Sequence, residues 1–399
     1  MAGPLSHLKV IDLSFYAPGR WATMILGDLG ADVIGIEMPR GRRPGDYSTL
    51  DSDTHVRWFW YQRNKRSITL DLKTEGGQRV FERLAKNADV IVESFRPGVA
   101  QRLSVDYASA RKHNPRIIYC SISGFGQTGP YRDVIGHEPN YQGLSGALGT
   151  NRITGGEPHV ASTITGDVGG GSSFALFGLL AAVIHRDKTG EGQYIDAAIT
   201  AGIVPYLGLF PYVGWYGDPY RSVLNSTNRR PDFRAYKTKD GKYVAVSPAE
   251  PWLWERFSQA IGRPDLSSKF EVADEASRDD LLAALTQTFA TRTQAEWLAV
   301  NDRENVSITA VYDSIQEIEA DPQMQEREMV VEVDYEPLGR VKQVGIPFRM
   351  SATPPSIRWM PRYGEHTDEV LTELDFTEAD IAAFRNEGTC EAEVEPHAG

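Results

Sequence analysis

Short apolar runs alternate with amphipathic segments along the first 123 residues. Apolar runs bounded by turn residues are typical of buried strands, whereas apolar positions three and four residues apart are typical of helices. The predicted strands are 8–14, 31–37, 88–94 and 116–123, and the predicted helices are 20–30, 75–87 and 106–114.

This repeated strand–helix–strand order predicts an α/β fold. Consecutive crossovers of that kind place the strands in parallel, with helices on both faces of the sheet. We expect a large Rossmann-like domain over 1–200, completed by 330–399. Its last segment, 172–200, contains an apolar helix, a glycine-rich turn and an apolar run that fits either a strand or a helix.

The pattern changes after the large domain. The aromatic, Pro/Gly-rich stretch 204–222 is typical of a packed linker, which we place at 201–224. Segment 233–249 predicts a hairpin that turns at Asp240-Gly241. Helical segments follow at 251–262, 278–290 and 293–300, then a β-like stretch at 328–345 and a helical run at 365–388. We expect a smaller α+β domain over 225–325 and a return to the large domain over 326–399.

Composition and charge narrow the function class. The 399 residues are 41% apolar and 24% charged, which is ordinary for a globular chain of two domains. A net charge of -12 argues against nucleic acid as the main partner, although an acidic protein can hold a local basic pocket. We find no signal peptide and no long uninterrupted apolar run, so we expect a cytoplasmic protein without a membrane partner. The two cysteines have no metal-ligand spacing, and we expect no metal.

Common nucleotide and hydrolase motifs are absent from the sequence. The first strand–helix turn, "SFYAPGRWA", holds only Gly19, so the glycine fingerprint of dinucleotide binding is missing. The patterns GxxxxGK[ST], HExxH and GxSxG do not occur either. We expect no prosthetic group.

Two stretches hold the candidate catalytic groups. "VIGHEPNYQ" (134–142) contains His137, and "ITGDVGGGSS" (164–173) sets Asp167 against three glycines. Taken alone, His137 is also explained as a structural residue in a turn, and Asp167 as a helix N-cap. If the following helix begins near Ser172, its free N–H groups could face Asp167 or a ligand oxygen.

Nine sequence blocks are spread in order over almost the whole chain: "MAGPLSHLKVIDLS", "GDLGADVIGIE", "RNKRSITLDLK", "ADVIVESFRPGV", "GFGQTGP", "GHEPNYQGLSG", "GDVGGGSS", "DKTGEGQYIDAA" and "GEHTDEVL". Together these blocks resemble the family III CoA-transferase (CaiB/BaiF) superfamily, which includes the alpha-methylacyl-CoA racemases. The resemblance implies an interlocked homodimer in which each chain has a large Rossmann-like and a small domain, with a coenzyme A thioester as substrate.

Within this superfamily the block around His137 resembles the racemase branch. Racemases carry Gly-His-Asp followed by Asn-Tyr, and this chain has Glu138 in place of that aspartate. Asp167 matches an aspartate that is a nucleophile in the transferases and an acid/base in the racemases. "SPAEPWLW" (247–254) resembles the racemase block that supplies a glutamate, here Glu250, which we expect to hydrogen-bond His137.

The resemblance also implies a set of coenzyme A contacts. Arg96 and Tyr141 match family positions used against the cofactor, as do Leu70 and Lys73 after "RSIT". Racemases have an arginine where this chain has Met38, so the contact is either lost or moved to Arg40 in "PRGRRPG". Arg63, Lys65 and Arg66 could contact the cofactor or only brace the fold.

The expected reaction is racemisation of a 2-methylacyl-CoA. Inverting the carbon next to a thioester needs a base on one face, an acid on the other and stabilisation of the enolate oxygen. His137 and Asp167 would supply the acid and the base. The alternative is CoA transfer between carboxylic acids through an aspartyl-acyl anhydride on Asp167, and a non-catalytic CoA-binding protein is a third reading.

Overall fold

The computed structural model describes residues 3–39, 61–150, 157–208, 210–216, 230–270, 275–335 and 339–391. The chain divides into two compact units. The first unit comprises Met1–Ala147, Val160–Tyr206 and Gln325–Gly399, and the second comprises Leu148–His159 and Leu207–Met324.

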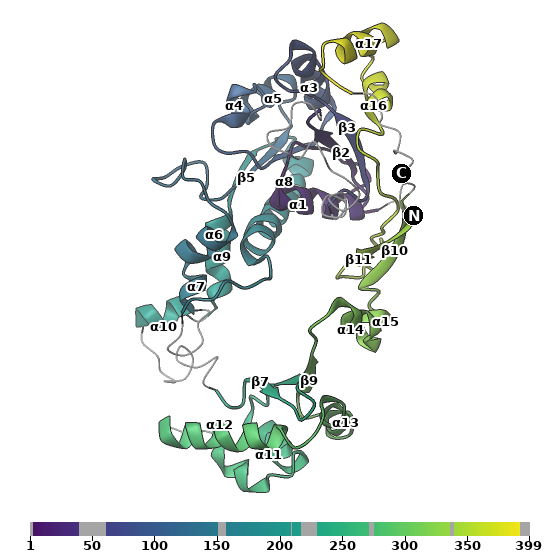
Figure 1. Ribbon diagram of the computed structural model, residues 1–399. Helices are drawn as coiled ribbons and strands as arrows, with labels where there is room; N and C mark the ends of the chain where they lie inside the picture. Colours follow the sequence, from purple (N-terminus) through teal and green to yellow (C-terminus); the bar gives the residue numbers. More distant parts are fainter. Residues whose placement is uncertain are drawn as a thin grey trace. The chain divides into compact units, whose positions relative to one another are not determined.

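The first unit is built on a six-stranded parallel sheet (Figure 1). The strand order β3-β2-β1-β4-β5-β6 reverses between β1 and β4, which makes this the switch point where α/β sheets bind ligands. The strands are β1 (Lys9–Asp12), β2 (Asp32–Glu37), β3 (Lys65–Thr69), β4 (Val90–Glu93), β5 (Ile118–Ser123) and β6 (Tyr194–Ala198). The α/β class with a parallel sheet is therefore confirmed.

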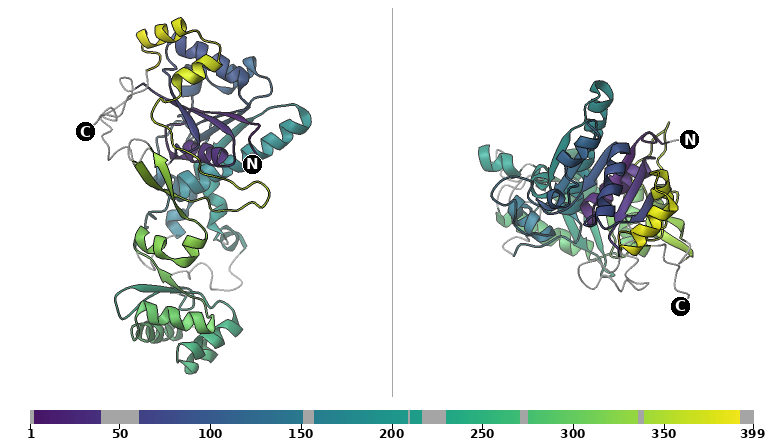
Figure 2. Two further views of the ribbon diagram at one scale, coloured as in Figure 1. Left: turned by 90° about the vertical axis from the view of Figure 1, so that its right-hand side faces the viewer. Right: turned by 90° about the horizontal axis from the view of Figure 1, so that it is seen from above.

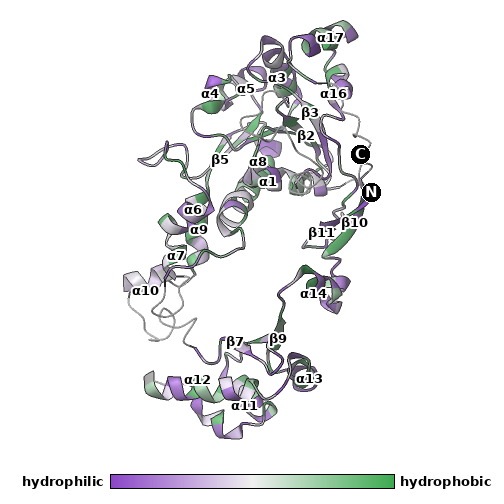
Figure 3. Cartoon of the chain, in the orientation of Figure 1, coloured by the Kyte–Doolittle hydropathy of each residue, from purple (hydrophilic) through white to green (hydrophobic). Residues whose placement is uncertain are grey.

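Helices cover both faces of this sheet (Figures 1 and 2). One core cluster joins the sheet to α3, α5, α16 and α17, and the other joins it to α1 and α8. The helices carry hydrophobic and hydrophilic residues side by side along their length (Figure 3), as expected when only one stripe faces a core. Their bounds are α1 (Ala17–Asp28), α3 (Glu75–Asn87), α5 (Tyr107–His113), α8 (Phe174–Thr189), α16 (Thr367–Glu373) and α17 (Glu378–Asn386).

Strand β3 was not among the predicted strands, because its sequence begins with two cations. Lys65 is nevertheless fully buried, and its ammonium donates to Asp12 Oδ2 at 2.9 Å, Thr23 Oγ1 at 2.8 Å and the Arg20 carbonyl at 2.9 Å. A buried ammonium with three acceptors is tolerated where a lone one is not. Arg63 likewise forms a buried ion pair with Asp28, at 2.7 Å. These cations brace the fold.

The helix after Asp167 begins earlier than expected. A start near Ser172 is wrong, since a wide π-helical turn, η3 (Thr165–Ser173), precedes α8. Helix α9 (Ile199–Ile203) packs closely against η3. A Cβ on Gly202 would lie only 2.0 Å from the Gly170 carbonyl oxygen. Asp167 therefore lies inside the first turn of a helix whose N-cap is Ile164.

The second unit is a three-stranded antiparallel sheet packed against helices. The predicted hairpin is confirmed, with Gly241 at a positive φ of 83° in the turn. Strand β9 was not predicted. Trp254, Phe257 and Trp297 lie at the centre of the core. The elements are β7 (Arg234–Lys237), β8 (Tyr243–Val246), β9 (Ile308–Val311), α11 (Pro251–Ala260), η5 (Pro264–Lys269), α12 (Glu275–Phe289), α13 (Gln294–Glu304) and α14 (Ile315–Ala320).

The remaining described elements are short. The β-like stretch after residue 328 is an antiparallel pair, β10 (Val330–Tyr335) and β11 (Gly339–Val344). In the described part of the predicted linker, 201–208 and 210–216, the chain forms short helices. The short helices are α4 (Val99–Arg102), α6 (Glu138–Ser145), α7 (Ala147–Thr150), η4 (Val204–Leu207), α10 (Phe210–Tyr216) and α15 (Pro322–Glu326).

One helical stretch, Thr165–Thr189, is long and apolar enough to cross a membrane by length and composition, with a mean hydropathy of 1.6. In its most apolar part, 44% of the residues are buried inside the structure. Leu176, Leu179 and Val183 on α8 belong to the core cluster shared with the sheet. A core helix of a globular unit has these same properties.

Candidate active site

A cavity of about 310 Å³ lies at the carboxyl ends of β4 and β5 in the first unit. The turn between β1 and α1 also lines it, so it sits at the switch point of the sheet. Four of the site residues expected from the sequence line this one cavity: Arg96, His137, Tyr141 and Asp167.

His137 reaches this cavity from the start of α6. It is the N-cap residue, with an extended backbone, and its N–H donates to the side chain of Asn140 at 3.0 Å. The Tyr141 hydroxyl donates to the Gly136 carbonyl one residue before His137. These contacts within one helix start fix the backbone around His137 while its side chain stays exposed.

Glu138 joins the His137 segment to the Asp167 segment. Its carboxylate accepts from the backbone N–H of Gly166 at 2.5 Å and of Asp167 at 2.7 Å. The side-chain amide of Gln142 donates to the same carboxylate at 2.7 Å. Two of the first N–H groups of η3, which a helix leaves unpaired, are satisfied in this way. Glu138 therefore sets the position of Asp167 relative to His137.

Gly166 is required for this contact. A Cβ at that position would lie 2.8 Å from a carboxylate oxygen of Glu138, closer than side chains approach one another. The close passage of Glu138 across the start of η3 therefore depends on the absence of a side chain at Gly166.

Asp167 is electrostatically unusual. Burial and, to a smaller extent, the charge of Glu138 together raise its pKa to about 6, against an opposing effect of His137. Burial also raises the pKa of Tyr141 to about 12, with Asp167 and Glu138 contributing and Arg96 opposing. The pKa of Tyr61 is raised by burial and then by Asp167. A carboxyl group with a pKa near 6 can accept and release a proton close to neutral pH.

Two further features of the cavity wall were not recognised from the sequence. The Ser94 hydroxyl is buried and has no hydrogen-bond partner among the described residues. Helix α1 begins at this wall, at Ala17, without a side-chain cap and without an acidic residue in its first turn. A hydroxyl group without a partner and an uncapped helix N-terminus are both suitable hydrogen-bond donors for a ligand oxygen.

Other expected site residues lie elsewhere. Leu70 is 2% exposed and belongs to a core cluster, so its side chain serves packing, whereas Lys73 is exposed two residues beyond the buried Asp71. The described lining of the 310 Å³ cavity includes neither of them. Glu250 is the exposed N-cap of α11 in the second unit. Arg40 lies outside the described residues, and the hydrogen bond from Glu250 to His137 stays a prediction.

No group of three or more His, Cys, Asp or Glu residues that could hold a metal ion occurs in the part of the chain that the structure describes.

The sequence matches the family model "CoA-transferase family III" over residues 5–367. It is 31% identical to the human alpha-methylacyl-CoA racemase over 398 residues, which cover 97% of this chain and 98% of the racemase. It is 34% identical to the beta subunit of succinyl-CoA–L-malate CoA-transferase from Chloroflexus aurantiacus, covering 93% of this chain and 94% of that subunit. The solved structure of a CAIB/BAIF family protein from Brucella suis matches with a TM-score of 0.79 and 28% identity, covering 94% of this chain and 100% of that one.

Proposed function

The chain belongs to CoA-transferase family III, and we propose that within this family it inverts the α carbon of a 2-methylacyl-CoA thioester by removing and returning a proton. The observation that carries this proposal is the presence of His137 and Asp167 in the lining of one cavity. Racemisation requires two such groups, one for each face of the carbon. The racemase relative, similar over nearly its whole length, supports the same reading.

The two groups divide the work by their protonation states. When one enantiomer is bound, the carboxylate of Asp167 or the imidazole of His137 takes the α proton, and the other group, in its protonated form, supplies a proton to the opposite face. The pKa of Asp167, about 6, leaves both forms of its carboxyl group accessible near neutral pH. A group with such a pKa suits both roles better than an ordinary aspartate.

The enolate oxygen that forms between these steps needs hydrogen-bond donors. The start of α1 and the Ser94 hydroxyl line the same cavity. Donors already fixed in position stabilise a developing oxyanion most effectively, because they need no reorganisation. We propose that the enolate oxygen accepts hydrogen bonds from the start of α1 and from the Ser94 hydroxyl.

Coenzyme A would be held by cations and backbone at the edge of the sheet. We propose Arg96 and Tyr141 as contacts from within the cavity, with Arg40, Leu70 and Lys73 along the route of the cofactor. Glu250 would act on His137 by fixing its orientation.

Arg96 offers the direct test of cofactor binding. Arg96→Ala should weaken CoA binding by about 1.5–3 kcal/mol, since it removes a charged hydrogen-bond donor from the ligand. Isothermal titration calorimetry with CoA measures this, and Lys112→Ala on α5 is a control that removes an exposed charge outside the cavity. Unchanged affinity in Arg96→Ala would remove Arg96 from the site.

CoA transfer is the second candidate, and a specific observation favours it. The CoA-transferase relative is 34% identical to this chain, and Glu138 departs from the racemase pattern. In that reaction Asp167 attacks the thioester carbonyl, an acyl anhydride forms and CoA leaves as the thiolate. His137 would then only shape the pocket.

We also propose that the protein is a cytoplasmic homodimer without a prosthetic group, a nucleic-acid partner or a membrane partner. An exposed apolar stripe on α8 supports a dimer, with Phe177 62% and Ile184 56% exposed. Phe174 and Ala181 lie on the same side of the helix, at spacings of three and four residues. Exposed apolar patches of this kind mark interaction surfaces.

Isotope exchange distinguishes the two reactions. The wild-type protein is incubated in deuterated water with one enantiomer of a 2-methylacyl-CoA, and chirality and α-deuterium are followed together. Racemisation gives inversion accompanied by deuterium uptake. Transfer of CoA to a carboxylate, with an Asp167 adduct trapped by hydroxylamine and without α exchange, would overturn the proposal.

A further inference from the structure

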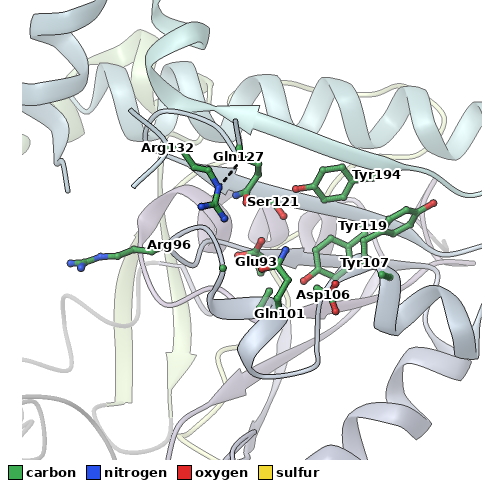
Figure 4. A pocket seen from close by; sticks show the side chains of 13 residues that line it. Glu93, Arg96, Gln101, Asp106, Tyr107, Tyr119, Ser121, Gln127, Arg132 and Tyr194 are labelled. Atoms are coloured by element: carbon green, nitrogen blue, oxygen red, sulfur yellow. Dashed lines mark hydrogen bonds between the residues drawn. The ribbon is translucent and has the colours of Figure 1, made fainter. Parts of the chain in front are cut away.

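A second cavity, of about 270 Å³, lies against β4, β5 and β6 (Figure 4). The strand register pairs Glu93 with Ser121 and Tyr119 with Tyr194, so these four side chains share one face of the sheet. Tyr119 belongs to the core cluster on this face, whereas its neighbour Cys120 belongs to the cluster on the other. The cavity is therefore a separate hollow over one face of the sheet, with α4 and the start of α5 beside it.

Arg96 and Arg132 both line this second cavity, but in Figure 4 the Arg96 side chain points away from the other labelled residues, whereas Arg132 lies beside Gln127. Arg132 is held in place, because its Nε donates to the Gln127 carbonyl at 3.0 Å and its Nη1 pairs with Asp133 at 2.9 Å. The guanidinium also lies against Gly98, where a Cβ would be 3.7 Å from Nη2. A guanidinium group in a fixed position, such as that of Arg132, is well suited to binding a carboxylate.

The floor of the second cavity is polar and buried. Glu93 is 3% exposed, and its carboxyl group accepts from the Phe95 N–H at 2.6 Å. Burial raises the pKa of Glu93 to about 7, with a hydrogen bond from Ser121 opposing and the charge of Asp196 adding to the rise. A carboxyl group in this state can donate or accept a hydrogen bond. The floor therefore suits a hydroxyl group.

The aromatic end of the cavity is closed by packing. The rings of Tyr107, Tyr119 and Tyr194 have centroids 5.5–6.2 Å apart, so they contact one another. Rings that touch one another leave no room between them for a cation, which excludes an aromatic cage. The volume, about 270 Å³, is also slightly below the usual range for ligand pockets. These facts favour a short ligand that lies between Arg132 and the floor formed by Glu93 and Ser121.

From this arrangement we propose that the second cavity binds a short-chain hydroxy acid, with its carboxylate on Arg132 and its hydroxyl group on Glu93 and Ser121. This site is distinct from the cavity that holds His137 and Asp167, although Arg96 and Arg132 line both. The proposal does not depend on which reaction the first cavity performs.

Calorimetric titration of the full chain tests the proposal with three matched probes. 4-Hydroxybutyrate carries both recognised groups, butyrate lacks the hydroxyl group and 1,4-butanediol lacks the carboxylate. We expect 4-hydroxybutyrate to bind, butyrate to bind several-fold more weakly and the diol not to bind. Saturating CoA should leave binding of 4-hydroxybutyrate in place, because the two ligands occupy different cavities.

Substitutions test whether 4-hydroxybutyrate binds in this cavity. Arg132→Gln should weaken 4-hydroxybutyrate binding at least tenfold, whereas Lys112→Gln, which loses the same charge on the exposed side of α5, should not. Arg132→Lys keeps the charge without the planar fork and should give an intermediate loss, which decides the matter if Arg132→Gln does not fold. Absence of binding in the wild type, equal loss in Arg132→Gln and Lys112→Gln, or displacement by CoA would each overturn the proposal.

Discussion

At the scale of single residues, the central relationship is between two carboxyl groups. Glu138 accepts the N–H groups of Gly166 and Asp167, and its charge raises the pKa of Asp167. The same side chain therefore positions Asp167 and adjusts its acidity. Its contacts join residues 28 and 29 positions apart in the sequence. Only the fold brings them together, so Glu138 could not be recognised as a positioning residue from its neighbours in the chain.

The raised pKa of Asp167 has a consequence for stability. Its folded-state pKa of about 6 exceeds the usual value for aspartate, so above pH 6 the ionised carboxylate lowers the free energy of unfolding. Below about pH 4 the carboxyl group is protonated in both the folded and the unfolded state, and this destabilisation is absent. Asp167→Asn should raise the melting temperature at pH 8 by about 2–4 °C, and the gain should vanish toward pH 4. Differential scanning calorimetry at both pH values measures this.

The control for this variant is Glu191→Gln, which removes an exposed carboxyl group. It should change the melting temperature little at either pH. An equal gain for Asp167→Asn at pH 8 and pH 4 would show that ionisation of Asp167 is not its cause.

At the scale of elements, close backbone packing sets where Asp167 stands. Helix α9 approaches η3 so closely that Gly202 and Gly170 touch through their backbones. Patterns in the sequence predicted β1, β2, β4 and β5 and most of the longer helices, because these elements carry regular apolar runs or stripes, whereas β3 and β9 were not predicted. These patterns did not predict that η3 begins at Thr165, because its glycines carry no periodic signal and its π-helical geometry depends on packing against α9.

Gly202→Ala tests this packing. The new Cβ would lie 2.0 Å from the Gly170 carbonyl oxygen, so η3 must shift away from α9. We expect a loss of about 1–3 kcal/mol in the free energy of unfolding, together with reduced catalytic activity, because Asp167 moves with η3. Urea denaturation and a rate assay measure the two effects.

Gly149→Ala on α7 is the matched control, because a Cβ there has no heavy atom within 4 Å. It should be neutral or slightly stabilising, since alanine is the better helix former. If Gly202→Ala behaved in the same way, the packing of α9 on η3 would not position Asp167.

At the scale of the whole molecule, the expected site is divided between two units. His137, Asp167, Arg96 and Tyr141 belong to the first unit, and Glu250 belongs to the second. The hairpin at Asp240-Gly241 and the helices of the second unit were predictable from local patterns. The arrangement of chains in an assembly depends on surfaces rather than on periodicity, so it does not follow from such patterns.

Phe177→Glu tests the proposed dimer. A carboxylate in the middle of the α8 stripe would be desolvated at an interface, so the variant should be monomeric in sedimentation analysis where the wild type is a dimer. Ile315→Glu, an equally apolar and exposed position on α14, should remain dimeric. A monomeric wild type with full activity would contradict the assembly proposed here.

The most direct test of two-base racemisation is to follow chirality and α-deuterium together in His137→Ala and Asp167→Ala, starting from one enantiomer in deuterated water. Each variant should lose inversion by at least about 10²–10⁴-fold, the usual contribution of a positioned proton-transfer group. The variant whose remaining base faces the α proton of that enantiomer should still exchange it with retention of configuration, and the other variant should show this exchange only from the opposite enantiomer. Inversion that persists in either variant would contradict the account.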